Sequence, residues 1–294
     1  MFAPIWLIVV GCLVAAYFLA TPLLIFTTFW HEAQPTLVPV PDVNDLPEPV
    51  LEYFSLGHSV LTPLGFKNVG TLSLPKATAN VKATLALFQN QRDETGCLLQ
   101  VFYVNVNGVW KMYSKYAEFC TSFEDDSEIN TANNEDVGSF PRNPNDISTQ
   151  HPAINDLKTL YEAHMAKVRH YGLRKRPRLV LNTRFNGNVK AYLSWAMNRE
   201  LRQGVDAGYI KLSVGQSGKD ADPTTASPNP YQSNSAADVS VFRATLWGAY
   251  LMSWKELWPI KPLFRWRKMG YDTTLLAKTG YVAPTESYPK AQTG

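Results

Sequence analysis

The sequence predicts an α+β protein in which an N-terminal transmembrane helix is followed by an antiparallel β-meander packed with two or three helices. Three observations predict this fold class. Residues 1–30 contain no charged side chain. Segments rich in β-branched and aromatic residues then follow one another without helical crossovers, which favours an antiparallel sheet with one face left for helices. Apart from one short helix near residue 50, the spacing of an amphipathic helix appears only after residue 152.

Residues 1–30 are long enough to cross a membrane. A bilayer core about 30 Å thick needs about 20 helical residues, and nearly every side chain of this run is apolar. Trp6 near one end, with Phe29 and Trp30 at the other, has the aromatic character of side chains that prefer the membrane–water interface. We expect Pro22 to kink or end the helix, because an interior proline removes a backbone hydrogen bond.

Two alternatives to an uncleaved span stay open. A cleaved signal peptide has a basic n-region and an apolar stretch of about 7–15 residues, whereas the first basic residue of this chain is Lys67. The tetrapeptide 9–12 resembles the site at which bacterial lipoprotein precursors are cleaved and acylated, but cleavage there would leave the apolar stretch 13–30 behind the lipid. Only the N-terminal amine favours keeping the short end inside, which favours a non-cytoplasmic soluble domain.

Residues 31–50 contain five prolines with acidic residues between them. Pro-rich segments are extended and semi-rigid, so we expect a linker that holds the folded part off the bilayer. Binding by a proline-reading module is the alternative. The soluble α+β domain is expected over 51–278, and a tail over 279–294.

The soluble domain is expected to begin with a helix over Val50–Leu61 and to continue with the sheet. The dipeptide Asn107-Gly108 predicts a type I′ hairpin turn, which places residue i opposite residue 215 − i. That register puts Cys97 and Cys120 on a diagonal, a poor geometry for a bridge, so free thiols are expected unless a bulge intervenes. The predicted strands are Val69–Leu74, Val81–Phe88, Cys97–Val106, Val109–Phe123 and a shorter one near Ile129.

Two longer helices are expected after the meander. Pro152–Tyr171 and Val189–Val205 have apolar residues at spacings of three and four. Residues 215–240 are rich in Gly, Ser, Asp, Asn and Pro and are expected to form a long mobile loop. Residues 241–269 have helical tendency, broken at two prolines. Two further strands are expected at Leu179–Phe185 and Tyr209–Val214.

The amphipathic segment 241–269 carries a second membrane signal. It contains four of the eight Trp residues of the chain, close to several Lys and Arg. This composition is typical of a helix that lies in a membrane interface. The alternative is a core helix followed by a basic surface turn. The candidate interface residues are Trp254, Trp258, Arg265, Trp266, Arg267 and Lys268.

Catalytic and metal-binding signatures are missing from the sequence, which has no G-x-S-x-G, H-E-x-x-H or C-x-x-C motif. The acidic stretch 124–130 lacks the Gly and Glu that an EF-hand loop requires, so we expect a solvated hairpin tip. His164 lies on the core face of a predicted helix, where a hydrogen-bonded structural role is expected. A basic cluster either complements a helix C-terminus or contacts an anionic headgroup: Lys167, Arg169, Arg174, Lys175, Arg176 and Arg178.

The composition bounds the function. With 45% hydrophobic residues the chain is not wholly disordered, and its three Cys cannot form a disulfide framework. A net charge of +3 is too small to indicate nucleic-acid binding. The expected partners are the lipid bilayer and one or more membrane proteins, with no cofactor. The sequence thus predicts a single-pass, membrane-anchored accessory or scaffold protein that is non-catalytic and docks to a membrane complex or lipid surface. The alternative is a membrane-tethered hydrolase with a site assembled from scattered residues.

Overall fold

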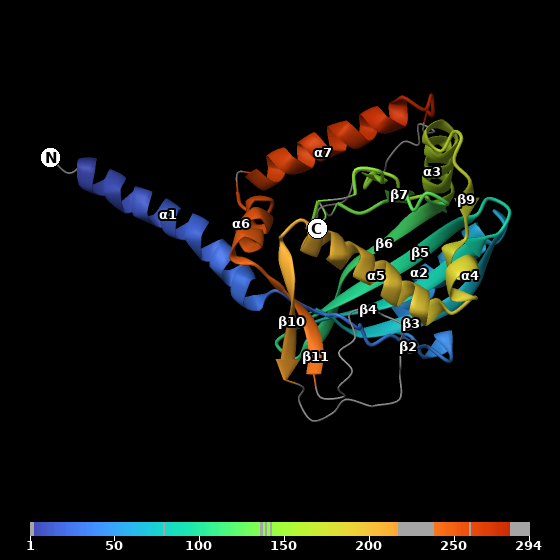
Figure 1. Cartoon of the computed structure of the whole chain (residues 1–294), viewed down its shortest axis with the longest axis horizontal. Helices are drawn as coiled ribbons and strands as arrows, with labels where there is room; N and C mark the ends of the chain where they lie inside the picture. The colour runs from blue at the N-terminus through green and yellow to red at the C-terminus, as the bar shows by residue number, and fades with distance from the viewer. Residues whose placement is uncertain are drawn as a thin grey trace.

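The computed structural model describes residues 3–78, 80–135, 138, 140–141, 143–216, 238–258 and 260–282. Within these, an N-terminal apolar helix is followed by an antiparallel-rich β-sheet packed with several helices, which confirms the predicted fold class. Figure 1 shows the helix α1 extending from one side of the folded part.

Helix α1 runs from Ala3 to Thr28 and continues through Pro22. Its threonine hydroxyls are satisfied within the helix: Thr27 and Thr28 donate hydrogen bonds of 2.9 and 2.7 Å to carbonyl oxygens four residues earlier. Such bonds leave no hydroxyl without a partner in an apolar environment.

Residues 31–50 are not a free spacer, which corrects the expectation from their composition. Strand β1 (Trp30–Glu32) pairs with β11 (Asp238–Ala244), and strand β2 (Val38–Pro39) pairs with β3. The side chain of Leu37 is buried in a cluster with leucines of β3 and β4. Proline is compatible with this arrangement because β2 is an edge strand, where a backbone N–H is not needed on the solvent side.

The large sheet has the order β2-β3-β4-β5-β6-β7-β8, with β9 pairing separately with β6. Its strands are antiparallel except for β7 and β8, which pair in parallel. The strand bounds are β3 Phe66–Thr78, β4 Val81–Asn90, β5 Thr95–Val106, β6 Val109–Phe123, β7 Glu128–Ala132, β8 Ile147–Gln150 and β9 Pro177–Arg178.

The β5–β6 turn has the predicted geometry, with φ values of 53° at Asn107 and 84° at Gly108. The predicted register holds from the turn to the pair formed by Tyr103 and Met112, and a bulge then shifts it by one residue. Cys97 therefore lies opposite Phe119 rather than Glu118. Cys97 and Cys120 are both free thiols, as expected.

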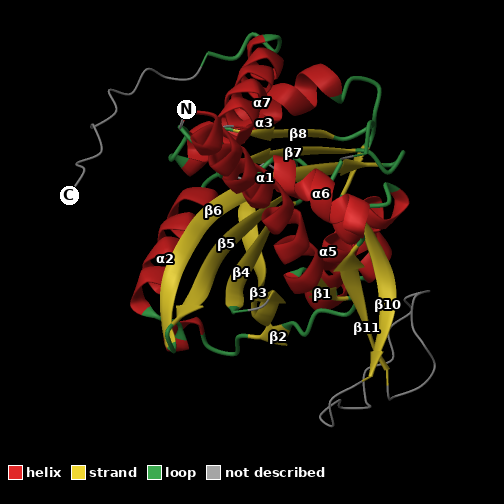
Figure 2. Cartoon of the chain, turned by 90° about the vertical axis from the view of Figure 1, so that its left-hand side faces the viewer, coloured by secondary structure: helices red, strands yellow, loops and turns green. Residues whose placement is uncertain are grey.

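Helices cover both faces of the large sheet, as Figure 2 shows for α2 and α5. On one side α2 and α3 bury a core that includes Phe66, Phe88 and Phe119. On the other side Leu193 of α5 packs with leucines of β3 and β4. The helix bounds are α2 Glu48–Leu61, α3 Leu157–Tyr171, α4 Val180–Phe185 and α5 Val189–Asp206.

The strand expected at Leu179–Phe185 is wrong, because most of this segment forms α4. The helix ends at Asn186, which adopts a left-handed conformation with φ 47°. The following Gly187 also has positive φ, and its N–H bonds to the carbonyl of Leu181 at 3.0 Å. This C-terminal cap closes a helical turn that alternation of apolar residues alone does not reveal.

A small sheet of order β1-β11-β10 and two C-terminal helices complete the described fold. Of the expected loop 215–240, residues 217–237 lie outside the described residues, and its flanks belong to the strands. Residues 241–244, expected to be helical, belong to β11. Part of the expected tail packs against α3, since the Tyr281 hydroxyl donates to the Thr159 carbonyl at 3.4 Å. The remaining bounds are β10 Ile210–Gln216, α6 Leu246–Trp254 and α7 Ile260–Ala277.

Candidate membrane interface

Helix α1 is apolar around its whole circumference, and most of its side chains are exposed. From Trp6 to Thr28 it is long and apolar enough to cross a membrane, and only 6% of its most apolar window is buried within the protein. These properties distinguish it from a core helix. Length and composition alone are shared by membrane anchors and signal sequences.

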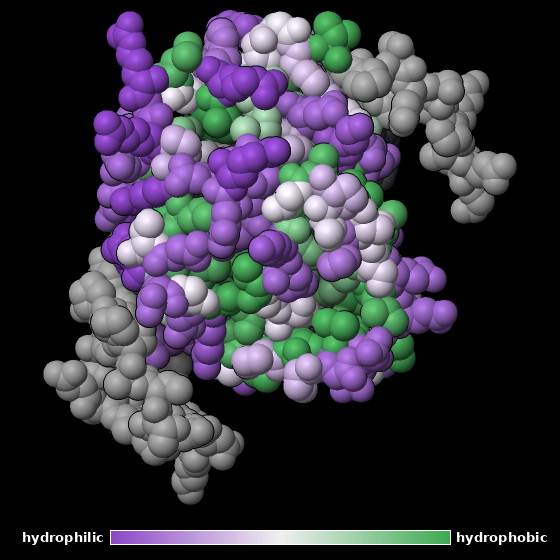
Figure 3. Space-filling model, turned by 90° about the vertical axis from the view of Figure 1, so that its right-hand side faces the viewer, coloured by the Kyte–Doolittle hydropathy of each residue, from purple (hydrophilic) through white to green (hydrophobic). Residues whose placement is uncertain are grey.

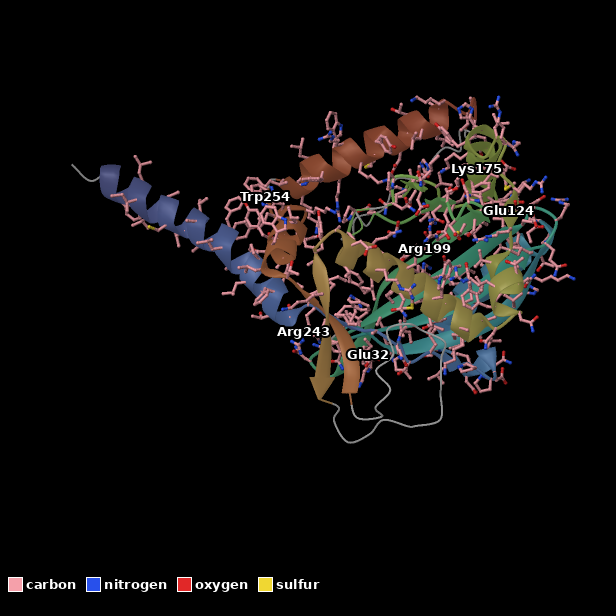
Figure 4. All side chains as sticks on the ribbon, in the orientation of Figure 1. Glu32, Glu124, Lys175, Arg199, Arg243 and Trp254 are labelled. Carbon is pink, nitrogen blue, oxygen red and sulfur yellow. The ribbon has the colours of Figure 1, made fainter. Side chains whose placement is uncertain are left out.

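One face of the C-terminal half of α1 packs against the folded part. Its partly or fully buried residues, among them Phe18, Pro22 and Ile25, recur at helical spacing. The rings of Phe18 and Trp254 lie 6.1 Å apart, and the backbone N–H of Trp258 donates to the Tyr17 hydroxyl at 3.2 Å. Figure 4 shows Trp254 between α6 and α1. The two helices, more than 200 residues apart in sequence, are therefore neighbours.

Helix α6 contains no charged residue from Leu246 to Trp254. Its inner face is built from Gly248, Ala249, Met252 and Ser253, and a Cβ on Gly248 would lie 1.7 Å from the carbonyl oxygen of Tyr209. Its outer face carries Leu246, Trp247 and Tyr250, which are exposed. An outer face without charge next to an apolar helix continues the hydrophobic surface of α1.

Helix α7 extends this surface away from α1 (Figure 1). It buries Asp272 and Leu275 against the folded part. Its exposed large apolar side chains lie mostly in its first half and are Leu263, Phe264, Trp266, Met269 and Tyr271.

The structure divides the predicted interface residues between two roles. Trp258 and Trp266 are 71% and 74% exposed, and Arg267 is also exposed. Arg265 instead lies 3.3 Å from Glu135, and Lys268 forms an ion pair with Asp272, so both connect α7 to charges of the chain itself.

The predicted interface aromatics of the N-terminal helix also lie in different surroundings. Trp6 is exposed on α1. Phe29 is partly buried, with its ring 5.0 Å from His31 and 6.1 Å from Phe140. Trp30 is partly buried in β1, opposite Arg243.

A buried ionic cluster joins α3, β8 and α7. Lys167 is completely buried; its ammonium group bonds to the Thr149 hydroxyl and lies 3.1 Å from Nε2 of His151. Burial lowers the pKa of Lys167 to about 7, with Asp272 opposing and Lys268 adding to this shift. Burial, together with the positive charges of Lys167 and Lys268, lowers the pKa of His151 to about 3. Asp272 accepts the backbone N–H of Gln150 at 2.9 Å and thus fixes α7 to β8.

His164 is a buried structural histidine, as expected from its place on the core face of α3. Its Nε2 lies 2.9 Å from the Thr121 hydroxyl and its Nδ1 3.0 Å from the Thr131 hydroxyl. Burial lowers its pKa well below the usual value. Both ring nitrogens are engaged with strands β6 and β7, so the side chain ties helix to sheet.

The acidic stretch and the basic cluster pair with each other. Lys175 lies 2.9 Å from Asp125, and Arg178 forms an ion pair with Asp126. A shallow depression of about 470 Å³ beside them is lined by residues of both signs, including Glu124 and Arg184. Figure 4 shows Glu124 and Lys175 at the side of the molecule away from α1. Among the described residues, no group of three or more His, Cys, Asp or Glu is placed to hold a metal ion.

Comparison with models of known protein families, with curated proteins and with solved structures gives no match to this chain. The features that bear on function are therefore those of the chain itself. They include an N-terminal helix compatible with a membrane anchor or a signal sequence.

Sequence reasoning missed the buried role of Lys167 by grouping it with surface cations. Its position was a usable signal, because Lys167 follows Leu160 and His164 on the inward face of α3 at spacings of four and three. The contact between α1 and α6 had no comparable signal, since it joins segments at opposite ends of the chain.

Proposed function

We propose that this chain is a single-pass, membrane-anchored accessory or scaffold protein that is non-catalytic and whose folded part rests on the lipid surface. The observation that carries the proposal is the packing of α6 along the C-terminal half of α1. Any bilayer that surrounds α1 then also meets the exposed apolar side chains of α6 and of the first half of α7.

The length of α1 supports this seating. Its 26 residues give a helix of about 39 Å, whereas the bilayer core measures about 30 Å. Fewer than two turns of α1 extend beyond a core that contains its first 20 residues or so. Tyr17 and Phe18, which contact α6, are the fifteenth and sixteenth residues of α1, so they would lie about one turn inside the border of such a core and keep α6 near that border. Trp and Tyr side chains are favoured at that depth.

The same contacts favour an uncleaved anchor over a signal sequence. Cleavage anywhere after Ile25 would remove the side chains of α1 that pack against α6 and the small sheet. Strand β1 begins only two residues after α1 ends, so a cleavage site there would also disturb its pairing with β11.

The opposite side of the molecule has a different character. Figure 3 shows that hydrophilic side chains cover much of this face, with smaller hydrophobic areas between them. The buried groups His164 and Lys167 have no exposed surface to present to a substrate. Both observations favour a docking role over the alternative of a tethered hydrolase.

Lipid quenching of tryptophan fluorescence tests the proposal on the full chain. The protein would be reconstituted into bilayers with and without brominated phosphatidylcholine, which quenches only tryptophans that contact acyl chains. We expect strong quenching that falls markedly in the Trp258→Phe/Trp266→Phe variant. The matched control is Trp110→Phe, since Trp110 is exposed on the sheet and away from α6 and α7. Equal quenching in the double variant and the unmodified chain would contradict lipid seating by these residues.

A separate measurement tests whether α1 is retained in the mature protein. Intact-mass analysis of the chain recovered from membranes should show a polypeptide that retains residues 3–28. Recovery of a chain that begins near residue 30 would show that α1 is removed and would end the proposal of an anchor.

A further inference from the structure

The β5–β6 hairpin ends in an exposed apolar patch that the membrane seating does not use. Figure 2 shows β6 extending well below β7, so this end of the hairpin stands beyond the neighbouring strand. The patch, here called the hairpin patch, consists of Val106, Val109, Trp110, Met112 and Tyr113, all of which are exposed.

The outer edge of β6 is open beside this patch. Strand β7 pairs only with residues Glu118–Ser122 of β6. The pairing ends at Ala117, whose N–H donates to the Asn133 side chain at 2.8 Å. In the part of the chain that the structure describes, no strand pairs with the outer edge from Val109 to Lys115. An open edge presents backbone N–H and C=O groups that an added strand can pair with.

Basic residues predominate in the segments around the open edge. Residues 53–92 and 101–117 contain no Asp or Glu. Lys111 and Lys115 are exposed on β6 itself. Lys82 of β4, on the far side of β5, lies 4.5 Å from the centre of the Trp110 ring, and this cation–π contact holds the aromatic side chain in place.

We propose that the outer edge of β6, from Val109 to Lys115, accepts an extended acidic and apolar protein segment as an added strand. Side chains of a strand alternate between faces, so the added strand would meet Trp110 and Met112 on one face and Val109 and Lys111 on the other. Because of the bulge after Met112, Lys111 and Lys115 lie on opposite faces of the sheet, so acidic residues on both faces of the partner strand would lie close to them. Main-chain pairing supplies affinity and the lysines select charge.

Two other occupants fit the edge less well. Hydrocarbon cannot satisfy the open N–H and C=O groups, so insertion of this edge into lipid is unfavourable. Pairing with the same edge of a second copy would bring Lys111 and Lys115 close to the lysines of that copy, and like charges across a strand pair are destabilising.

The inference rests on the proposed docking function, for which it names the class of protein partner, but it uses a surface distinct from α6 and α7. The test uses the full chain in bilayers of neutral lipid and a fluorescent peptide of about nine Glu and Val residues, with Glu on both faces of the strand and the length of an ordinary strand. We expect saturable binding. The Lys111→Glu/Lys115→Glu variant should bind about tenfold more weakly, because it replaces two opposite-charge pairs by like-charge pairs.

Two controls make the test specific. The Lys158→Glu/Lys190→Glu variant makes the same charge change at exposed positions of α3 and α5 and should bind as the unmodified chain does. A peptide methylated on alternate backbone nitrogens keeps its charge but cannot form the ladder, and it should not bind. This second control uses the unmodified chain, so it remains decisive if a variant fails to fold.

Several results would overturn the inference. These are absence of saturable binding, equal binding of the methylated peptide, or equal weakening by both double variants. Sedimentation showing a dimer that Lys111→Glu/Lys115→Glu dissociates would assign the edge to a second copy, and loss of lipid quenching in Trp110→Phe would assign it to the bilayer. None of the peptide results alters the quenching of Trp258 and Trp266, so failure of this inference is separable from failure of the proposed function.

Discussion

The large sheet and the α6–α7 pair use aromatic side chains in opposite ways. In the sheet, Phe66, Phe88 and Phe119 are at most 1% exposed and form the core beneath α2 and α3. In the helix pair, Trp258 and Trp266 are more than 70% exposed. Aromatic content therefore does not separate a core from an interface. The separation comes from which face of an element meets the rest of the chain, and a distant segment determines that face.

The largest effect is expected in the sheet. Phe119→Ala should lower the free energy of unfolding by about 3–5 kcal/mol, because it removes a completely buried ring and leaves a cavity. Urea unfolding of the full chain in detergent micelles, followed by circular dichroism, measures this. A loss below about 1 kcal/mol would mean that the sheet core is less closely packed than its burial indicates.

A smaller but still large effect is expected where α6 meets β10. Gly248→Ala should destabilise the chain by about 3 kcal/mol, because the new Cβ would lie 1.7 Å from a backbone oxygen that cannot move freely. Gly270→Ala in α7 is the matched control: no atom lies within 4 Å of its Cβ. The control should be neutral or stabilising by up to about 1 kcal/mol. Equal stability of the two variants would show that α6 is not held closely against β10.

An intermediate effect depends on pH. The pKa of Lys167 is about 7 in the folded chain, against 10.5 for an unburied lysine. Between these values the unfolded state binds one more proton than the folded state, so the free energy of unfolding rises with pH. The contribution of Lys167 should rise by about 2 kcal/mol from pH 7 to pH 9, and it levels off below pH 7 as this lysine becomes protonated in both states. Below pH 7 the buried His151, with a pKa of about 3, keeps the free energy of unfolding rising with pH.

Substitution of Lys167 separates its contribution to the pH dependence of unfolding from the contributions of other groups. Lys167→Met should remove the rise between pH 7 and pH 9, whereas Lys190→Met, on the exposed side of α5, should keep it. Urea unfolding at a series of pH values measures both variants. A rise that persists in Lys167→Met would assign the pH dependence to another group.

The smallest effect is expected at the exposed aromatics. Trp266→Ala should change the free energy of unfolding in detergent by less than about 0.5 kcal/mol, because its side chain is 74% exposed. The same urea titration measures it beside Phe119→Ala. A loss comparable with that of Phe119→Ala would place Trp266 in the core and remove the distinction between the two regions.

Local signals allowed much of the fold to be predicted. Helix α3 ends at Tyr171 as predicted, with Gly172 following the last turn. Its start at Leu157, capped by Asp156, lies five residues after the predicted start at Pro152. The Asn107-Gly108 turn likewise determines its own φ angles. The features that were missed depend on distant partners. The bulge in β6 and the pairing of Val38 with Ser73 arise from packing between strands, which no short stretch of sequence specifies.

The candidate site was predicted in part for the same reason. The composition of 241–269 indicated Trp258, Trp266 and Arg267, which are exposed, and their contact with lipid stays a prediction. It did not distinguish them from Arg265 and Lys268, whose partners Glu135 and Asp272 stand on a distant loop and on the next helical turn. Composition does not show which charged side chains form ion pairs with distant parts of the chain.

The pairing of β1 with β11 has a consequence for biosynthesis. Trp30 lies opposite Arg243, which the ribosome adds 243 − 30 = 213 residues later. At about 5–20 residues per second, β11 is synthesised about 10–40 s after β1, the strand with which it pairs. Helix α1 waits still longer for α6, while the strands of the large sheet follow one another closely in time. The joining of the two ends of the chain is therefore among the last steps of maturation, after the large sheet has had time to form.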